Sequence, residues 1–349
     1  MELTDFRTLG RTGLRISPLT LGTMTFGDPS WGTSPEAAYE ILSRYLDGGG
    51  NAIDTANAYM GGMSENILGE YLSKRPGLRD RLVIATKVAL SMDHADPNNG
   101  GTGRKAILRH IEESLDRLNT DYVDIYWQHN WDRHTPLEET LSALDDVVRA
   151  GKARYIGLSD TPAWAVARMA TLAEWRGWTP VVAIQAEFNL LERTIEGELA
   201  GAARAFGLGV MPWSPLANGM LTGKYTRDRH NPPASGRGVF VARHLHEGAF
   251  QILDTLDRIA VAHGTSIAAV SLAWVRQQPL VSSTIIGART IRQLDDNLAS
   301  LKITLSAQEL AELDDLTTPA LGFPFGFLQN VGFPAQQGTT LINGLAGNA

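Results

Sequence analysis

The sequence predicts an α/β protein in which eight parallel strands, each followed by a helix, close into a (β/α)8 barrel. Short apolar runs alternate with long amphipathic segments along nearly all of the 349 residues. Most of these runs are apolar throughout, which is typical of strands that are buried on both faces. No block of consecutive strands interrupts the alternation, so we expect a closed parallel sheet in a single domain over residues 1–349.

The expected strands are short and spread along the whole chain. A hairpin is expected before them at Phe6–Ser17, where Gly10-Arg-Thr-Gly13 forms the turn, and it can plug the bottom of the barrel. The eight strands cover Leu19–Gly22, Ala52–Ala56, Leu82–Lys87, Val123–His129, Tyr155–Asp160, Val182–Phe188, Gly209–Pro215 and Thr284–Ala288.

Helix boundaries are marked by capping residues. Ser34-Pro-Glu36 places a cap, a first-turn proline and an acid in order, and Thr135-Pro-Leu-Glu138 repeats this arrangement. Gly48 and Gly151 are expected to end the helices that precede the second and fifth strands.

Two segments are too long for the simple repeat. Residues 216–247 form a loop insertion rich in Gly, Pro, Arg and His, and residues 318–349 form a Gly/Phe/Pro-rich tail after a helix at Ser306–Thr317. Long loops in compact domains are commonly functional. We therefore expect long loops at the carboxyl ends of the strands, with the tail lying over the active-site face.

The composition excludes several classes of function. A net charge of −7 without a basic block argues against a nucleic-acid partner. The chain has no cysteine, so disulfides and thiolate chemistry are excluded and a reducing compartment is permitted. No secretory signal and no membrane-spanning run is visible, so a cytoplasmic protein is expected. The sequence gives no indication of the oligomeric state.

Ionisable side chains follow three consecutive strands. Asp54 ends the second strand and Tyr59 lies five residues later, Lys87 ends the third strand, and His129 ends the fourth. In a barrel of this type, reactive groups come from the carboxyl ends of the strands. A lysine ammonium beside a phenol lowers the phenol pKa, and a carboxylate holds that lysine charged. Asp54, Lys87 and Tyr59 can therefore form a proton relay beside a histidine that bonds a substrate oxygen.

The motifs around these residues resemble those of the aldo-keto reductase superfamily. The resemblance is carried by Ala52–Tyr59, Ala85-Thr-Lys87 and Asp124–His129, and it extends from about Phe6 to Leu316. It implies reversible reduction of aldehydes and ketones to alcohols. Tyr59 would be the general acid/base, Lys87 its activator, Asp54 the partner of the lysine, and His129 the residue that orients the substrate.

The resemblance also implies NADPH/NADP+ as the cofactor. No G-x-G-x-x-G follows a strand, so the dinucleotide would not be held in the Rossmann manner. Ser159, Asp160 and Gln185 would face the nicotinamide carboxamide, Trp213 would stack on the ring, and Arg289 would bind the 2′-phosphate. The remaining cofactor residues implied are Gly22, Thr23, Met24, Ser214, Leu216, Lys224, Gly287, Gln293 and Asn297.

Position 160 departs from the commonest family motif. It holds Asp where that motif has Asn, and a carboxylate cannot donate a hydrogen bond to the carboxamide oxygen. Ser159-Asp-Thr-Pro-Ala-Trp164 resembles the branch of aryl-alcohol dehydrogenases and fungal polyketide reductases, which implies an aromatic or polyketide-like small molecule as substrate. Its pocket is expected to be largely apolar and to include Met60, Met92, Trp131 and Phe325.

Two other functions remain open from the sequence. Lys87 could form a Schiff base, as in an aldolase on the same barrel. The chain could also be a redox-sensing binding protein similar to the ion-channel β-subunits that resemble this family. No metal is expected, because His129, Asp132 and His134 lack the spacing of a metal site and are better explained as loop residues.

Overall fold

A (β/α)8 barrel forms the centre of the computed structural model, which describes residues 1–30, 32–228 and 238–342. Its strands are β3 (Leu19–Gly22), β4 (Ala52–Asp54), β5 (Val83–Val88), β6 (Val123–Gln128), β7 (Ala153–Ser159), β8 (Val181–Glu187), β9 (Gly209–Trp213) and β10 (Thr284–Gly287). They form one parallel sheet in the order β10-β3-β4-β5-β6-β7-β8-β9, and a bridge from Val210 to Val281 brings β9 next to β10. The predicted fold class is confirmed.

Each predicted strand agrees with an observed one to within two residues at either end. The reason is visible in β5 and β6, where every residue is buried. One face of each strand points into the barrel and the other packs against the surrounding helices, so both faces select apolar side chains.

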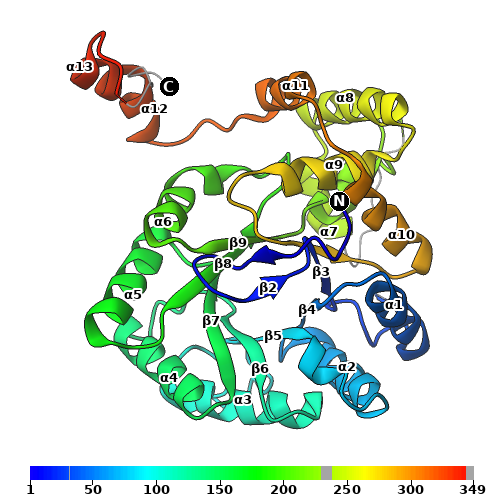
Figure 1. Cartoon of the computed structure of the whole chain (residues 1–349), viewed down its shortest axis with the longest axis vertical. Helices are drawn as coiled ribbons and strands as arrows, with labels where there is room; N and C mark the ends of the chain where they lie inside the picture. The colour runs from blue at the N-terminus through cyan, green and yellow to red at the C-terminus, as the bar shows by residue number, and fades with distance from the viewer. Residues whose placement is uncertain (31, 229–237, 343–349) are drawn as a thin grey trace.

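Helices surround the barrel, as Figure 1 shows. The longer ones are α1 (Pro35–Asp47), α2 (Met63–Ser73), α3 (Arg104–Leu118), α4 (Leu137–Arg149), α5 (Ala163–Arg176), α6 (Glu198–Phe206), α8 (Glu247–His263), α9 (Ile267–Gln277), α10 (Ile291–Ala299) and α11 (Ala307–Thr317). The shorter ones are η1 (Tyr59–Gly62), η2 (Arg79–Arg81), η3 (Thr194–Glu196), η4 (Ala217–Thr222), α7 (Gly238–Val241), η5 (Ala242–His244), η6 (Ser300–Lys302), α12 (Phe325–Phe327), η7 (Leu328–Gly332) and α13 (Phe333–Gln337).

The helix boundaries mostly follow the predicted caps. The Ser34 side chain accepts a hydrogen bond from the backbone N–H of Ala37, and Gly48 ends α1. The predicted cap at Thr135 is wrong: α4 has Pro136 at its N-cap, and the Thr135 hydroxyl donates instead to Asp132. That carboxylate lies close enough to compete with the helix end for the hydroxyl.

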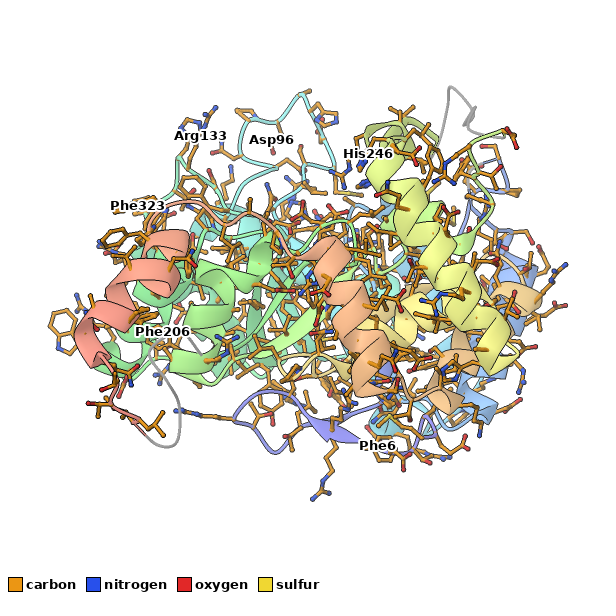
Figure 2. The ribbon with its side chains drawn as sticks, turned by 90° about the horizontal axis from the view of Figure 1, so that it is seen from above. Phe6, Asp96, Arg133, Phe206, His246 and Phe323 are labelled. Carbon is orange, nitrogen blue, oxygen red and sulfur yellow. The ribbon has the colours of Figure 1, made fainter. Side chains whose placement is uncertain are left out.

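The predicted hairpin is present as β1 (Arg7–Thr8) and β2 (Arg15–Ile16), and it plugs the bottom of the barrel. Leu9 and Ile16 have no exposed surface and pack with inward-facing side chains of the strands. Gly10 has a φ of +56°, and a Cβ there would lie 2.5 Å from the carbonyl oxygen of Val182 at the start of β8. Figure 2 shows Phe6 of the hairpin segment at the opposite end of the molecule from Asp96, Arg133 and His246 in the long loops.

The two long segments differ in where they lie. The described part of the 216–247 insertion follows β9 at the carboxyl ends of the strands and contains η4, α7 and η5; residues 229–237 lie outside the described residues. The tail, described up to residue 342, runs along the outside of the barrel beyond α6 (Figures 1 and 2). It therefore does not cover the active-site face as we predicted, because Leu321 and Phe325 lie against Gly197 at the start of α6 instead.

No single helix in the described ranges is long and apolar enough to cross a membrane. Helices α8 and α9 meet that length and composition only together, as a pair bent by 96°.

Candidate active site

Three of the predicted catalytic side chains meet at the carboxyl ends of β4 and β5. The Lys87 ammonium donates to Asp54 Oδ2 at 2.5 Å, to the carbonyl oxygen of Thr55 at 2.8 Å and to Tyr59 Oη at 3.0 Å. Lys87 has no exposed surface, and the side chain of Asp54 is 3% exposed. All three N–H bonds of the ammonium are thus used inside the protein, which fixes its position beside the phenol.

The electrostatics of this group depend on burial as well as on charge. Burial lowers the pKa of Lys87, but the Asp54 carboxylate and Tyr59 outweigh this effect, so the pKa is raised overall and the lysine stays charged. Burial raises the pKa of the Tyr59 phenol, and the Lys87 ammonium only partly opposes that rise. The predicted net lowering of the Tyr59 pKa is therefore not what the structure shows, and the tyrosine is held neutral, in the form that can donate a proton.

His129 lies beside this group at the end of β6. Its ring meets the Tyr59 ring edge-on, with the centroids 5.7 Å apart. Burial, together with the charge of Lys87, lowers the pKa of His129 to about 3, so the imidazole is neutral. Its buried Nδ1 has no hydrogen-bond partner within the described part of the chain. A neutral ring at the mouth can offer a single N–H to a substrate oxygen.

The residues predicted to face the nicotinamide carboxamide adjoin the catalytic group. Gln185 Nε2 donates to Asp54 Oδ1 at 3.0 Å, and Asp160 Oδ1 accepts from Trp213 Nε1 at 3.0 Å. Ser159 is buried beside them at the end of β7. Desolvation in the mouth raises the pKa of Asp160 to about 6, and the neighbouring Glu187 adds to this rise.

The segment after Trp213 has an unusual backbone. Ser214, Ala217, Asn218 and Gly219 all have positive φ, of 50°, 46°, 57° and 98°. Non-glycine residues in this region store strain and cluster at functional sites. Further along the chain, the Lys224 side chain lies over this turn: a Cβ on Gly219 would be 2.6 Å from its Nζ.

Gly287 and Arg289 lie just before α10, and the other two predicted cofactor residues of this segment, Gln293 and Asn297, lie on that helix. The Gln293 side chain accepts from the backbone N–H of Arg289, and Asn297 Nδ2 donates to the carbonyl oxygen of Gly287 at 3.1 Å. The Arg289 side chain is exposed and makes no ion pair with any described residue. Thr290 caps α10 by accepting from the N–H of Gln293, and the exposed guanidinium of Arg289 thus lies next to the N-terminus of this helix.

The predicted residues after β3 have different surroundings. Gly22 packs closely against β10, since a Cβ there would lie 2.8 Å from Ile285 Cγ2. Thr23 is buried and bonds Ser64 Oγ at 2.7 Å, whereas Met24 is 39% exposed. Of the three, Met24 is therefore the one with an exposed side chain. Leu216, on the strained segment, is partly buried against the core.

Three of the four predicted pocket residues lie in loops that follow barrel strands. Met60 follows Tyr59 with a φ of 52°, Met92 follows β5, and Trp131 follows β6. Phe325 lies elsewhere: its ring is 3.5 Å from the position that a Cβ on Gly197 would occupy, on the outer flank near α6. Its placement in the pocket was wrong, because the tail does not cross the mouth.

The sequence reasoning missed several residues at this site. Trp164 meets Trp131 edge-on with ring centroids 5.7 Å apart, and Asn189 Nδ2 donates to the carbonyl oxygen of Ser214 at 3.1 Å, which holds the strained segment. Glu187 ends β8 and pairs with Arg243 at 2.6 Å. The strand-end rule could have found Glu187 and Asn189, because both lie at the end of β8.

Within the described ranges, no group of three His, Asp or Glu side chains is arranged to hold a metal ion. Asp132 instead organises its loop, accepting from the N–H of Thr102, the N–H of His134 and the hydroxyl of Thr135.

The barrel, with buried ionisable groups at the carboxyl ends of its strands, has the architecture of the α/β-barrel enzymes. The model of the Aldo/keto reductase family matches residues 18–318, and the chain belongs to this family.

The chain is 37% identical over 321 residues to an uncharacterized oxidoreductase of Bacillus subtilis, and the match covers 89% of this chain and 95% of the relative. It is also 36% identical to norsolorinic acid reductase of Emericella nidulans (90% and 82% covered) and 33% identical to an aryl-alcohol dehydrogenase of Pestalotiopsis microspora (90% and 82% covered). The chain is thus an oxidoreductase of a family that uses nicotinamide cofactors.

Proposed function

We propose that the protein is an NADPH-dependent reductase of aldehydes and ketones that also runs in reverse, with Tyr59 as the general acid/base. The observation that carries this proposal is the contact of Lys87 Nζ with both Asp54 and Tyr59 Oη at the strand ends. Such a group can deliver one proton to an oxygen that is gaining negative charge. The edge-on position of His129 beside the phenol supports its assignment as the residue that orients that oxygen.

The residues present fit a nicotinamide dinucleotide. Strained positive-φ backbone from Ser214 to Gly219 is typical of a loop shaped around a ligand, and such backbone can turn N–H groups toward phosphate oxygens. Arg289 makes no ion pair with any described residue and lies beside the start of α10, which supports its assignment to the 2′-phosphate, because guanidinium and helix N-terminus both attract anions. A dinucleotide bound along these residues would supply or accept a hydride.

The proton path follows from the contacts. Tyr59 is held neutral by burial, so in reduction it gives its proton to the carbonyl oxygen as that oxygen becomes an alkoxide. The Lys87 ammonium, fixed by Asp54, stabilises the phenolate that remains. In alcohol oxidation the same phenolate takes the proton back. The reaction direction is then set by the cofactor ratio rather than by these residues.

The substrate class we propose is an aromatic or polyketide-like carbonyl compound. The names of two relatives support this proposal: one is an aryl-alcohol dehydrogenase and the other a norsolorinic acid reductase. The edge-on pair of Trp131 and Trp164 supports this proposal, because it offers an aromatic wall beside the loop that follows His129. Met60 and Met92 would add adaptable apolar surface.

A Schiff-base aldolase is disfavoured by the same contacts. A nucleophilic lysine must lose its proton, but Lys87 donates three hydrogen bonds and its pKa is raised. No contact in the described structure favours the redox-sensing role over the enzyme.

The test is the loss of nicotinamide absorbance with purified protein, NADPH and a panel of aromatic aldehydes and ketones. Wild-type turnover that falls by about 10²-fold or more in Tyr59→Phe, with NADPH binding retained, supports the proposal. Near-normal turnover in Tyr59→Phe would show that another group is the acid. Absence of NADPH binding by the wild-type protein would overturn the proposal.

A further inference from the structure

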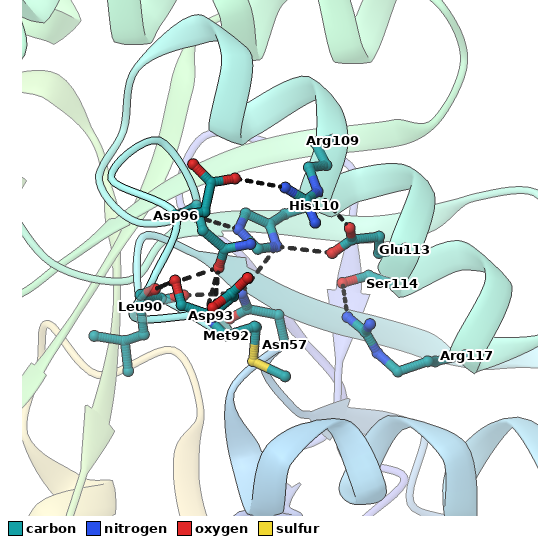
Figure 3. Close-up of polar contacts among 12 residues, drawn as sticks. Asn57, Leu90, Met92, Asp93, Asp96, Arg109, His110, Glu113, Ser114 and Arg117 are labelled. Atoms are coloured by element: carbon teal, nitrogen blue, oxygen red, sulfur yellow. Dashed lines mark hydrogen bonds and ion pairs between the residues drawn. The ribbon is translucent and has the colours of Figure 1, made fainter.

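The loop between β5 and α3, residues 89–103, is joined directly to the catalytic segment (Figure 3). It leaves the strand that carries Lys87 and contains Met92, a predicted pocket residue. Asn57, two residues before Tyr59, has no exposed surface and donates from Nδ2 to the carbonyl oxygen of Leu90 at 3.2 Å. The first turn of the loop therefore rests on the segment that positions the phenol.

Asn99 organises the inside of this loop. Its Oδ1 accepts from the backbone N–H of Met92 at 2.6 Å and from that of Asp93 at 3.0 Å. Its backbone carbonyl oxygen accepts from Nε2 of His110 on α3. His110 has no exposed surface and Asn99 is 1% exposed, so this contact is shielded from water. The position of Met92 thus depends on Asn99, and the position of Asn99 depends on His110.

His110 lies between two buried asparagines. The carbonyl oxygen of Asn99 can only accept, so Nε2 of His110 must carry a proton. On the other side of the ring, Nδ1 faces Asn57 Nδ2 at 3.4 Å and Glu113 Oε2 at 3.2 Å. The imidazole therefore connects the Asn57 segment on one side to Asn99 on the other.

A second connection holds the same loop at the surface. Arg109 pairs with Asp96 at 3.0 Å and with Glu113 at 2.7 Å, and its side chain is 44% exposed. Exposed ion pairs contribute little, whereas breaking a buried hydrogen bond leaves an unsatisfied group. The buried imidazole should therefore dominate the order of the loop.

We propose that His110 is a positioning residue that fixes the loop of residues 89–103 against the Tyr59 segment and thereby sets how well bulky carbonyl substrates bind. His110 does not touch the reacting atoms and acts through Asn99 and Asn57. Its effect on substrates rests on the proposed carbonyl reductase function. Its effect on the order of the loop does not.

The experiment compares His110→Leu, which removes both hydrogen bonds, with His110→Gln, whose amide can still donate to Asn99. Arg109→Gln is the matched control, because it removes the exposed connection from the neighbouring position. The KM and kcat are measured with a bulky aromatic aldehyde and with propionaldehyde, alongside the Kd for NADPH. Hydrogen exchange of the Met92 and Asp93 amides is measured on the same proteins.

In His110→Leu we expect the KM for the bulky aldehyde to rise about tenfold, with kcat and the NADPH Kd within about twofold of wild type. Exchange of the Met92 and Asp93 amides should quicken by about tenfold. His110→Gln should recover most of both effects, and Arg109→Gln should show neither. Unchanged KM and unchanged exchange in His110→Leu, or an equal loss for both aldehydes together with weaker NADPH binding, would overturn the proposal.

The hydrogen-exchange measurement separates the two proposals. If the wild-type protein reduces no carbonyl compound but His110→Leu still quickens exchange at Met92 and Asp93, the positioning role stands and the proposed function fails. If the wild-type protein turns over and His110→Leu changes neither exchange nor KM, the proposed function stands and the positioning role fails.

Discussion

Replacing Asp160 by Asn is expected to stabilise the protein at alkaline pH and much less at acid pH. Desolvation raises the pKa of this carboxyl from 3.8 to about 6, the Trp213 hydrogen bond opposes the rise, and Glu187 adds to it. Asparagine keeps an oxygen that accepts from Trp213 Nε1, and it tolerates the left-handed φ of 41° at this position. The substitution therefore removes the charge with little other change.

The size of the effect follows from the raised pKa. A rise of about 2 units corresponds to about 3 kcal/mol at full ionisation. Asp160 is surrounded by protein atoms that desolvate it, yet part of its surface is open to solvent at the mouth, so solvent screening reduces this to about 1 kcal/mol. The native state holds the proton more tightly than the unfolded state between pH 3.8 and about 6, so stability is lost as pH rises through this window. The penalty is about half developed at pH 5 and complete above pH 7.

Urea unfolding at pH 5 and pH 8 measures the difference between Asp160→Asn and wild type. The variant should gain about 1 kcal/mol at pH 8 and about half of that at pH 5. Asp132→Asn is the control: hydrogen bonds from Thr135, Thr102 and His134 outweigh its desolvation and lower its pKa, so this variant should lose stability at pH 8. An equal gain for Asp160→Asn at both pH values, or no gain at pH 8, would refute the reasoning.

Three further predictions test the site and its support. Lys87→Met removes the ammonium that opposes the rise in the Tyr59 pKa, so the phenol should ionise at a still higher pH, as measured by ultraviolet absorbance. Turnover should fall by about 10²-fold or more. An unchanged titration of the phenol would contradict the assigned contact. Arg289→Ala should raise the Kd for NADPH by about tenfold and leave that for NADH nearly unchanged, and equal effects would remove Arg289 from the phosphate site. Arg117→Leu removes the charge partner of the fully buried Glu65, 2.7 Å away, and leaves it only the hydrogen bond from Thr86, so thermal unfolding should report a loss of about 3 kcal/mol. A loss below about 1 kcal/mol would contradict the importance of the pair.

Much of the fold could be predicted because its determinants are local in the sequence. Each barrel strand is a short, mostly apolar run, six of the eight end at a polar or glycine residue, and each boundary was found to within two residues. The cap at Ser34 was predicted for the same reason, since a helix end is decided by a few adjacent residues. The predicted cap at Thr135 was wrong because its hydroxyl donates a hydrogen bond to Asp132, a residue that the local capping pattern does not include.

The candidate site was only partly accessible from the sequence. Asp54, Tyr59 and Lys87 could be brought together in advance, because neighbouring parallel strands place their carboxyl ends at one edge. His110 could not be connected to this site, because its contacts join α3 to residues 11 and 53 positions away. An isolated histidine on a helix gives no sign of which distant groups it will meet.

The sequence by itself determined the order of strands and helices and the residues at the strand ends, since these follow from local patterns of apolar and polar side chains. The tertiary structure decided three further properties. It placed Leu321 and Phe325 of the tail beside Gly197 at the start of α6, because an apolar side chain can contact any apolar surface and the sequence does not say which one. It set the pKa values of Tyr59 and Asp160, because desolvation depends on everything packed around a group. It also joined His110 to the catalytic segment, because that contact exists only once the barrel is closed.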